Sequence, residues 1–340
     1  MSDFELGPIR PPAEADSLLI RTTRGCPWNK CHFCTLFTGM RFSIRKVEEI
    51  KQDIAAAQLH YAGAPFETCF LQDGDSFAMR TKDLIEVLTT LKEAFPSLKR
   101  ISSYGRAQTM MRKSEAEIGE IHDAGLNMLY SGIESGSDQV LELVNKGVTQ
   151  DAIIQSTLRA RQAGMNIMVF VILGLGGKEL SHDHVSQTAL VLNTINPNSV
   201  RMMSLAVKQR TELGNKIEQG SFTMLSEIEM IEEQRRLIES LEGIHCHYGN
   251  FHGINLLTEI EGILPEYTTK LLSSIDVFLS LSPELQRNFI LGRRLRYYGR
   301  LAGFEDSPKF QSVQLQVDNI LTENPDSIET VFHDLRNRII

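Results

Sequence analysis

The chain has 340 residues, of which 42% are apolar, 23% charged and 7% aromatic, a composition typical of a globular protein with a large core. Its 35 lysines and arginines against 43 aspartates and glutamates give a formal net charge of −8, which argues against nonspecific binding to nucleic acid or an anionic membrane. No apolar run reaches the roughly 20 residues of a membrane-spanning helix, and the acidic start differs from a signal peptide. We therefore expect a cytoplasmic protein.

Six short apolar or β-branched runs alternate with longer amphipathic stretches, a pattern typical of βα units around a parallel sheet. The expected strands are Ser17–Thr22, Glu67–Gln72, Arg100–Tyr104, Met128–Ile133, Ile167–Leu173 and Ser199–Val207. The expected helices are Val47–Ala62, Thr81–Phe95, Ser114–Ala124, Gln139–Val144 continuing through Asp151–Ala163, Ser181–Thr194 and Ser226–Glu242. The predicted fold is α/β: a partial (β/α)6 TIM-like barrel, in which catalytic groups lie at the carboxyl ends of the strands.

The strand signal fades after residue 243, and the remaining sequence favours an all-helical carboxyl-terminal extension. Its expected helices are Ile254–Gly262, Tyr267–Ser280, Pro283–Arg300, Lys309–Thr322 and Ser327–Asn337. The predicted organisation is therefore a lead-in over residues 1–15, a core domain over 16–243, and a helical extension over 244–340 that caps the barrel.

Three of the five cysteines, Cys26, Cys31 and Cys34, form a C-x4-C-x2-C loop directly after the first expected strand. Three thiolates this close can bind three irons of a [4Fe–4S] cluster and leave the fourth iron open for another ligand. A zinc site is the alternative, with His32 as a fourth donor, although ligation by His32 and both neighbouring cysteines is cramped. An odd number of cysteines, three of them within nine residues, suits a reducing compartment and a metal better than a disulfide framework.

These residues resemble the radical S-adenosylmethionine (radical SAM) superfamily, although its commonest spacing is C-x3-C-x2-C and this loop has one residue more. The resemblance implies that the three cysteines hold a [4Fe–4S] cluster whose open iron binds the amino and carboxyl groups of S-adenosylmethionine. It also implies that Phe33, just before the last cysteine, lies beside the adenine of this cofactor.

Asp73, Gly74 and Asp75 end the second strand, where the superfamily has a Gly-Gly-Glu-like motif. By this resemblance, a carboxylate here bonds the ammonium group of S-adenosylmethionine. An ordinary Asp-Gly turn is the alternative. Tyr104 and Arg106 lie at the end of the third strand, where relatives place polar residues near the methionine group, although Arg106 also suits an exposed surface.

The segment from Tyr130 to Gly147 is similar to one shared by the Elongator catalytic subunit, the tRNA methylthiotransferases and the oxygen-independent coproporphyrinogen III oxidases. The similarity implies that Glu134 and Ser135 lie near the ribose or methionine part of S-adenosylmethionine and Lys146 near its carboxylate. The alternative is that Ser135 and Ser137 or Asp138 cap the next helix, and both roles can hold together. The resemblance continues at the fifth strand, where it places Ile172, Gly174 and Leu175 against the adenine.

The segment from His245 to His252 is dense in histidine. Its candidate catalytic residues are His247, Tyr248 and His252, which can line a substrate pocket; alternatively, His245, Cys246, His247 and His252 bind a metal.

The resemblance implies an enzyme that cleaves S-adenosylmethionine reductively to a 5′-deoxyadenosyl radical, which abstracts hydrogen from a substrate that the sequence does not identify. An external donor such as flavodoxin or ferredoxin supplies the electron. The basic segment Gly292–Arg300 makes RNA a possible substrate, and a peptide is another. A non-catalytic Fe–S or zinc-binding module is the competing class.

Overall fold

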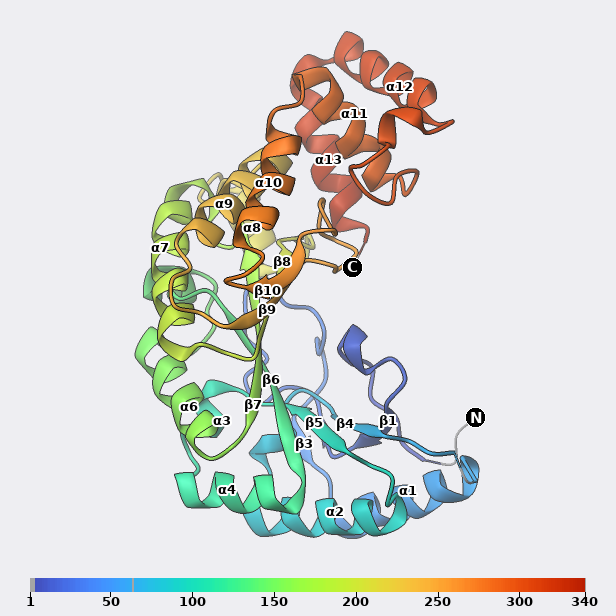
Figure 1. The fold of residues 1–340 in the computed structure, drawn as a ribbon, viewed down its shortest axis with the longest axis vertical. Coiled ribbons are helices and arrows are strands. Elements are labelled where there is room, and N and C mark those ends of the chain that lie inside the picture. Colours follow the sequence, from blue (N-terminus) through green and yellow to red (C-terminus); the bar gives the residue numbers. More distant parts are fainter. Residues whose placement is uncertain (1–3, 63, 340) are drawn as a thin grey trace. The chain divides into compact units, whose positions relative to one another are not determined.

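The computed structural model describes residues 4–62 and 64–339. Figure 1 shows its helices and strands. The chain divides into two compact units: Met1–Ile133 with Asn145–Val169 form the first, and Glu134–Val144 with Phe170–Ile340 form the second. The domain boundaries predicted near residues 15 and 243 remain a prediction.

Eight strands follow the sheet order β1-β4-β5-β6-β7-β8-β9-β10, and β7 contributes its first half to one unit and its second half to the other. The strands are β1 (Leu18–Arg21), β4 (Thr68–Gln72), β5 (Arg100–Tyr104), β6 (Leu126–Glu134), β7 (Asn166–Leu173), β8 (Ser199–Ser204), β9 (Cys246–Gly249) and β10 (Glu261–Leu264). The pairs β1/β4, β4/β5, β5/β6 and β8/β9 are parallel, and β9/β10 is antiparallel. The α/β class and all six predicted strands are confirmed.

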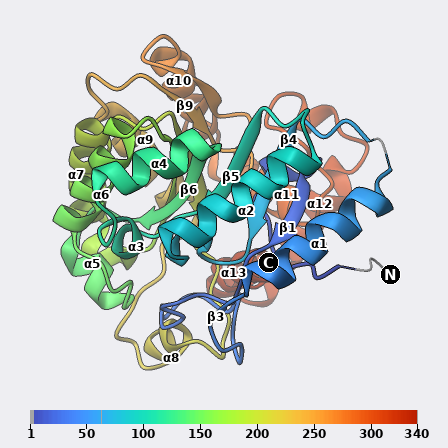
Figure 2. The same cartoon turned by 90° about the horizontal axis from the view of Figure 1, so that it is seen from below.

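In the first unit, helices cover one face of the strands. They are α1 (Val47–His60), α2 (Thr81–Ala94), α3 (Ala107–Met110), α4 (Glu115–Ala124) and α6 (Gln150–Gln162). Figure 2 shows α2 lying between α1 and α4, with which it packs. α2 buries Leu84, Val87, Leu88 and Leu91, which share one face of the helix because their spacing follows the helical repeat.

The second unit contains the remaining α-helices: α5 (Asp138–Leu143), α7 (Gly177–Ile195), α8 (Glu212–Glu218), α9 (Glu227–Glu239), α10 (Thr268–Leu279), α11 (Pro283–Arg294), α12 (Phe310–Glu323) and α13 (Ile328–Asn337). α9 packs against α7 and α10, and α11 packs against α12 and α13. Within residues 4–62 and 64–339, no helix combines the length and the apolar character needed to cross a bilayer.

The carboxyl-terminal part differs from the prediction in two places. The helix expected at Ile254–Gly262 is wrong, because this segment consists of turns and the start of β10, which pairs with the unexpected strand β9. Each of these strands has only four residues, and their pairing with distant partners gives no local sequence signal. The helix expected to reach Arg300 ends at Arg294, since Arg296 adopts a left-handed conformation with φ 63°.

A buried carboxylate fastens the lead-in to the sheet of the first unit. Glu14 accepts hydrogen bonds from Ser17 and Tyr130, from the Ser102 hydroxyl at 2.8 Å, and from the Arg100 guanidinium at 3.0 Å. Because its acceptors are satisfied in this way, the carboxylate can remain buried beneath the strands.

Candidate active site

The three cysteines lie on one loop of the first unit, which is closed at its base by a two-stranded ribbon. In this ribbon, β2 (Thr23–Arg24) pairs antiparallel with β3 (Ser43–Ile44). None of the cysteines is in a disulfide bond, and all three are half-buried. The peptide N–H of Cys34 donates to the carbonyl of Cys31 at 3.2 Å, so these two residues share one turn. The loop thus presents three accessible thiols from a fixed base.

The donor set fits a cluster bound at three irons. Within the described ranges 4–62 and 64–339, no three His, Cys, Asp or Glu side chains converge as they would around a single metal ion. Thiolates that bind three different irons of one cluster do not need to meet at one point. Between residues 22 and 46 the chain carries five lysines and arginines and no acidic residue, a local charge that suits an anionic cluster.

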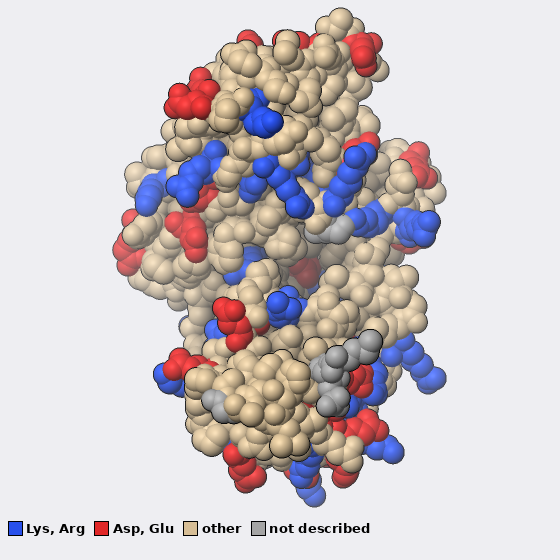
Figure 3. Space-filling model, turned by 90° about the vertical axis from the view of Figure 1, so that its right-hand side faces the viewer, with Lys and Arg blue, Asp and Glu red and all other residues tan. Residues whose placement is uncertain are grey.

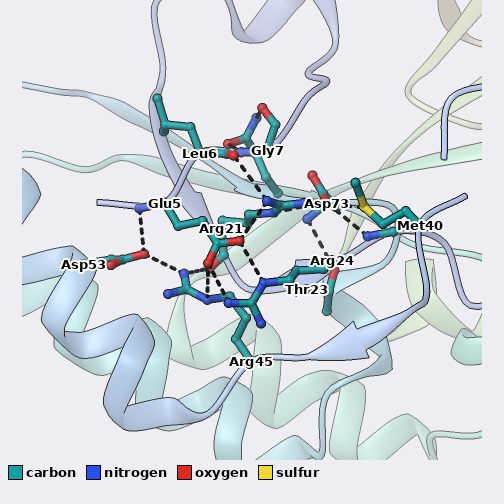
Figure 4. Close-up of polar contacts among 12 residues, drawn as sticks. Glu5, Leu6, Gly7, Arg21, Thr23, Arg24, Met40, Arg45, Asp53 and Asp73 are labelled. Carbon is teal, nitrogen blue, oxygen red and sulfur yellow. Dashed lines mark hydrogen bonds and ion pairs between the residues drawn. The ribbon is translucent and has the colours of Figure 1, made fainter. Parts of the chain in front are cut away.

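Asp73 anchors the base of the cysteine loop. Its carboxylate receives two bonds from the Arg21 guanidinium, at 2.5 and 3.1 Å, and one from the peptide N–H of Gly25 at 3.2 Å (Figure 4). Both side chains of the ion pair are buried. Asp73 is therefore engaged in holding the residue next to Cys26, and Arg21 is a buried partner of this carboxylate.

Glu5 joins the lead-in to this anchor. Its carboxylate bonds Arg21 at 2.8 Å and Arg24 at 2.8 and 2.6 Å, and lies 3.4 Å from Arg45, as Figure 4 shows. The hydrogen bond from Arg24 lowers the pKa of Glu5, and the charges of Arg45 and Arg21 add to this against a partial burial. Arg45 in turn bonds Asp53 of α1 at 2.6 Å. The network ties the loop base to α1 and to the lead-in.

Gly74 lies directly against the cysteine loop. Its peptide N–H donates to the carbonyl of Gly25 at 3.2 Å. A Cβ atom at Gly74 would come within 2.8 Å of that carbonyl oxygen, closer than real side chains approach, and within a tight 3.1 Å of the Cys26 Cα. Only glycine fits here without displacing the loop.

Asp75 is fully buried and has one oxygen, Oδ1, without a hydrogen-bond partner. Its other oxygen lies 2.7 Å from the Thr109 hydroxyl, which also lies 2.8 Å from the carbonyl of Arg106. Burial raises the pKa of Asp75 to about 7, against the opposing effects of Thr109, Arg106 and Lys113. A protonated Asp75 can donate to Thr109, which then donates to the carbonyl, so the neutral form satisfies this chain of bonds.

We expect Asp75→Asn to change the pH dependence of stability. The folded protein holds a proton on Asp75 that the unfolded chain releases near its ordinary pKa of 3.8, so stability falls as the pH rises from about 4 to about 7 and then levels off. Asparagine stays neutral throughout this range, and its amide N–H can still donate to Thr109. Melting temperatures at pH 5 and pH 8, without S-adenosylmethionine, should differ more in the wild type than in the variant; equal differences would contradict a buried, protonated Asp75.

Arg106 links the loop to the turn that contains Lys146. One guanidinium nitrogen lies 3.8 Å from the Cys26 sulfur, and the other donates to the carbonyl of Lys146 at 3.3 Å. The Lys146 side chain is buried. Tyr104 packs edge-on against Phe70 with ring centroids 5.2 Å apart. Arg106 and Lys146, which are distant in the sequence, are thus brought to the cysteine loop.

Phe33 is half-buried on the cysteine loop, between His32 and Cys34.

The last residue of β6, Glu134, is the first residue of the second unit and has a strained backbone. Glu134 has a φ of 65°, in the left-handed region that residues other than glycine rarely adopt. Such backbone conformations occur preferentially at functional sites. The Ser135 hydroxyl lies 2.8 Å from the His184 ring nitrogen and accepts from the peptide N–H of Ser137. Ser137 caps α5 by accepting from Val140, so the expected capping role is confirmed.

The end of β7 in the second unit combines apolar side chains with a left-handed glycine. Gly174 has a φ of 79°, and its peptide N–H donates to the buried Glu233 carboxylate at 2.5 Å. Ile172 and Leu175 are buried on either side. This segment offers an apolar surface with a backbone fixed by Glu233.

The histidine-rich segment is held mainly by structural contacts. His247 pairs with Glu261 across β9 and β10 at 3.0 Å, and the Tyr248 hydroxyl is buried and accepts from Gln234 at 2.9 Å. His252 accepts from the peptide N–H of Ile254, and burial lowers its pKa. Burial raises the pKa of the Cys246 thiol to about 12. These residues do not converge on one point, so the structure adds no support to a metal at this segment.

The basic segment is partly turned inward. Arg294 is buried and bonds Glu227 at 2.8 and 2.5 Å, and Arg293 donates to the carbonyl of Leu256 at 3.2 Å. Arg296 and Arg300 remain exposed. Figure 3 shows Lys and Arg side chains gathered in the upper half of one face.

Sequence reasoning missed several residues that shape the site. Glu5 and Thr109 give no local signal, because their partners lie far along the chain. The signal for Trp28 was present, since it is the single tryptophan of the chain and lies inside the cysteine motif.

The family model of the radical SAM superfamily matches residues 20–189, half of the chain and the part that carries the cysteine loop. The chain belongs to this superfamily, whose members use a [4Fe–4S] cluster and S-adenosylmethionine and need a reductant. The family resemblance in the sequence is therefore confirmed.

Curated relatives that match by sequence include two proteins named methyltransferases. An uncharacterised methyltransferase of Pyrococcus horikoshii is 30% identical over 158 residues, 46% of this chain and 32% of that protein. The bacteriochlorophyllide d C-8(2)-methyltransferase of Chlorobaculum tepidum is 29% identical over 158 residues, 44% of this chain and 34% of that protein. The matches thus span about a third of these relatives.

Among solved structures, the coproporphyrinogen III oxidase of Escherichia coli, a radical SAM enzyme, matches with a TM-score of 0.51 and 16% identity, covering 66% of this chain and 50% of that one. This likeness shows the fold alone.

Proposed function

We propose that the protein is a radical SAM enzyme in which Cys26, Cys31 and Cys34 hold a [4Fe–4S] cluster. When bound and reduced, the cluster supplies the electron that cleaves S-adenosylmethionine to methionine and a 5′-deoxyadenosyl radical, which takes hydrogen from a substrate. The observation that carries this proposal is the cysteine loop itself: three accessible thiols, with Arg106 beside Cys26 and Gly74 packed against the loop.

Asp75 is our candidate for the ammonium group of S-adenosylmethionine, in preference to Asp73. Asp73 already binds Arg21 and Gly25, and its remaining oxygen lies beneath Gly7, where an added Cβ would come within 2.1 Å. Oδ1 is buried without a hydrogen-bond partner in both aspartates, but Asp75 bonds the neutral Thr109 hydroxyl where Asp73 bonds a guanidinium, so a bound cation would favour the ionised form of Asp75. Lys146 is the candidate for the carboxylate of the cofactor.

The remaining contacts with S-adenosylmethionine are proposed from the family resemblance. Phe33 and the segment Ile172–Leu175 would contact the adenine, and Glu134 and Ser135 the ribose. The strained backbone of Glu134 and the fixed backbone of Gly174 support these roles. A flavodoxin or ferredoxin in the cytoplasm would donate the electron.

The test is an anaerobic reconstitution with iron and sulfide, followed by dithionite and S-adenosylmethionine and quantification of 5′-deoxyadenosine. The wild type and a Cys246→Ser control, which loses a buried cysteine outside the loop, should bind about four irons and form this product. A triple variant with Cys26→Ala, Cys31→Ala and Cys34→Ala should do neither. Equal product in the triple variant would refute the proposal.

Methyl transfer is the second candidate, because both relatives matched over 158 residues are named methyltransferases. Quantifying S-adenosylhomocysteine beside 5′-deoxyadenosine in the same reaction tests for methyl transfer. Transfer of the methyl group of S-adenosylmethionine yields S-adenosylhomocysteine, whereas reductive cleavage yields 5′-deoxyadenosine and methionine.

A further inference from the structure

Three successive peptide carbonyls receive side-chain hydrogen bonds in the turn Asn145-Lys146-Gly147. The Trp28 indole N–H donates to the carbonyl of Asn145 at 2.7 Å, and Arg106 donates to that of Lys146 at 3.3 Å. The Gln108 amide donates to the carbonyl of Gly147. The turn belongs to no helix or strand, so these side chains replace the bonds that regular structure would supply.

The Trp28 ring also fills the space beside Gly147. Gly147 has a φ of 70°, and a Cβ added there would lie 2.3 Å from the indole ring. In return, the Asn145 side-chain amide donates to the carbonyl of Lys30 at 3.0 Å. The cysteine loop and the turn are therefore joined by two hydrogen bonds and by a close contact that only glycine permits.

The chain turns sharply next to Trp28. Asn29 adopts a left-handed conformation with φ 47°, and its amide donates to the carbonyl of Phe37 at 2.8 Å. These contacts fix the backbone of the residue that follows Trp28, between Cys26 and Cys31.

We propose that Trp28 is a positioning residue that holds the turn of residues 145–147, and with it Lys146, onto the cysteine loop. The proposal rests on the proposed function, in which Lys146 receives the carboxylate of S-adenosylmethionine. Arg106 adds a second link between the loop and the turn, because its guanidinium contacts the Cys26 sulfur and donates to the Lys146 carbonyl. Loss of the Trp28 contact should weaken cofactor binding and leave the three cysteine ligands intact.

Three variants test this contact. Trp28→Phe keeps a ring and removes the N–H, Trp28→Leu removes both, and Gly147→Ala displaces the ring. Gly39→Ala is the matched control, since Gly39 lies in the same loop with φ 77° but has no atom within 4 Å of an added Cβ. It therefore reproduces the backbone strain of Gly147→Ala without the clash.

We expect all four variants to retain iron close to the wild-type amount. The dissociation constant for S-adenosylmethionine, measured by equilibrium dialysis, should rise about tenfold in Trp28→Phe, as expected for one lost hydrogen bond, and further in Trp28→Leu and Gly147→Ala. It should stay within about twofold in Gly39→Ala.

Two readouts need no cluster. Hydrogen exchange in the apoprotein should become faster at residues 145–149 in Trp28→Leu and Gly147→Ala. Because the chain has one tryptophan, its fluorescence reports on Trp28 alone, and acrylamide should quench it more strongly in Gly147→Ala than in Gly39→Ala.

Unchanged exchange together with unchanged cofactor affinity would overturn the role of Trp28 and leave the proposed function intact. Iron loss in Trp28→Phe equal to that of a cysteine variant would also overturn it, since Trp28 would then support the cluster and not the turn. If the wild type itself binds no cluster, the proposed function fails. The contact of Trp28 can still be tested then, because it would be refuted if hydrogen exchange and acrylamide quenching in the variant apoproteins equalled those of the wild type.

Discussion

Replacing Asp73 with alanine is expected to destabilise the first unit by about 3 kcal/mol and to release the cysteine loop. The substitution leaves the buried Arg21 guanidinium without its closest carboxylate, and it removes the acceptor of the Gly25 peptide N–H. Glu5 still bonds Arg21, which limits the loss. Urea unfolding followed by hydrogen exchange at residues 22–45 measures both effects, and iron binding should fall together with stability.

The control for Asp73→Ala is Asp83→Ala, which removes an aspartate that bonds the exposed Arg80 at 2.7 and 3.0 Å. An exposed pair contributes little to stability, so this variant should resemble the wild type. The double variant Arg21→Met with Asp73→Leu should be more stable than Asp73→Ala, because no buried charge is left alone. Wild-type stability in Asp73→Ala would show that the ion pair is not an anchor.

Glu227→Ala should destabilise the second unit by about 3 to 5 kcal/mol, which is the cost of leaving buried charge without a partner. Glu227 begins α9 and is buried between Arg294 of α11 and Arg336 of α13, at 2.5 and 3.1 Å. One carboxylate thus compensates two buried guanidinium groups on different helices. Hydrogen exchange should show α11 and α13 losing protection, whereas Glu239→Ala, at the exposed end of α9, should leave it unchanged.

The same contact predicts a loss of stability in acid. Burial alone would raise the pKa of Glu227, but the charges of Arg294 and Arg336 reverse this and hold the pKa below its ordinary value of 4.5. The stabilisation is therefore complete above pH 4.5 and is lost as the pH falls through the lowered pKa. A wild type whose α11 and α13 lose no protection at any pH below 4.5, relative to pH 6, would contradict this.

The parallel strands could be predicted because each is a continuous apolar run that contains its own signal. β7, for example, reads as a strand buried on both faces, and its predicted bounds differ from the observed ones by one residue. β9 and β10 could not, because four-residue strands are defined by the partners they pair with. Arg296 ended α11 through a backbone conformation that no helix propensity indicates.

The site was predictable as a set of residues but not as a set of contacts. The cysteine spacing and the Asp73-Gly74-Asp75 motif identified the region. The division of roles between the two aspartates depends on Arg21 and Thr109, which lie 52 and 34 residues away in the sequence. Both carboxylates look alike in the sequence, and only tertiary structure distinguishes the one that bonds a guanidinium from the one that bonds a hydroxyl.

The path of the chain has a consequence for any attempt to divide this protein. Since the chain changes unit after Ile133, Val144 and Val169, neither unit is a contiguous fragment. A split at residue 133 would separate Trp28 from its partner Asn145, and a split at residue 169 would cut β7 in the middle. Two fragments produced by either split would have to re-form the contact between Trp28 and Asn145, or the strand β7, when they associate. A single cut therefore cannot separate the two units.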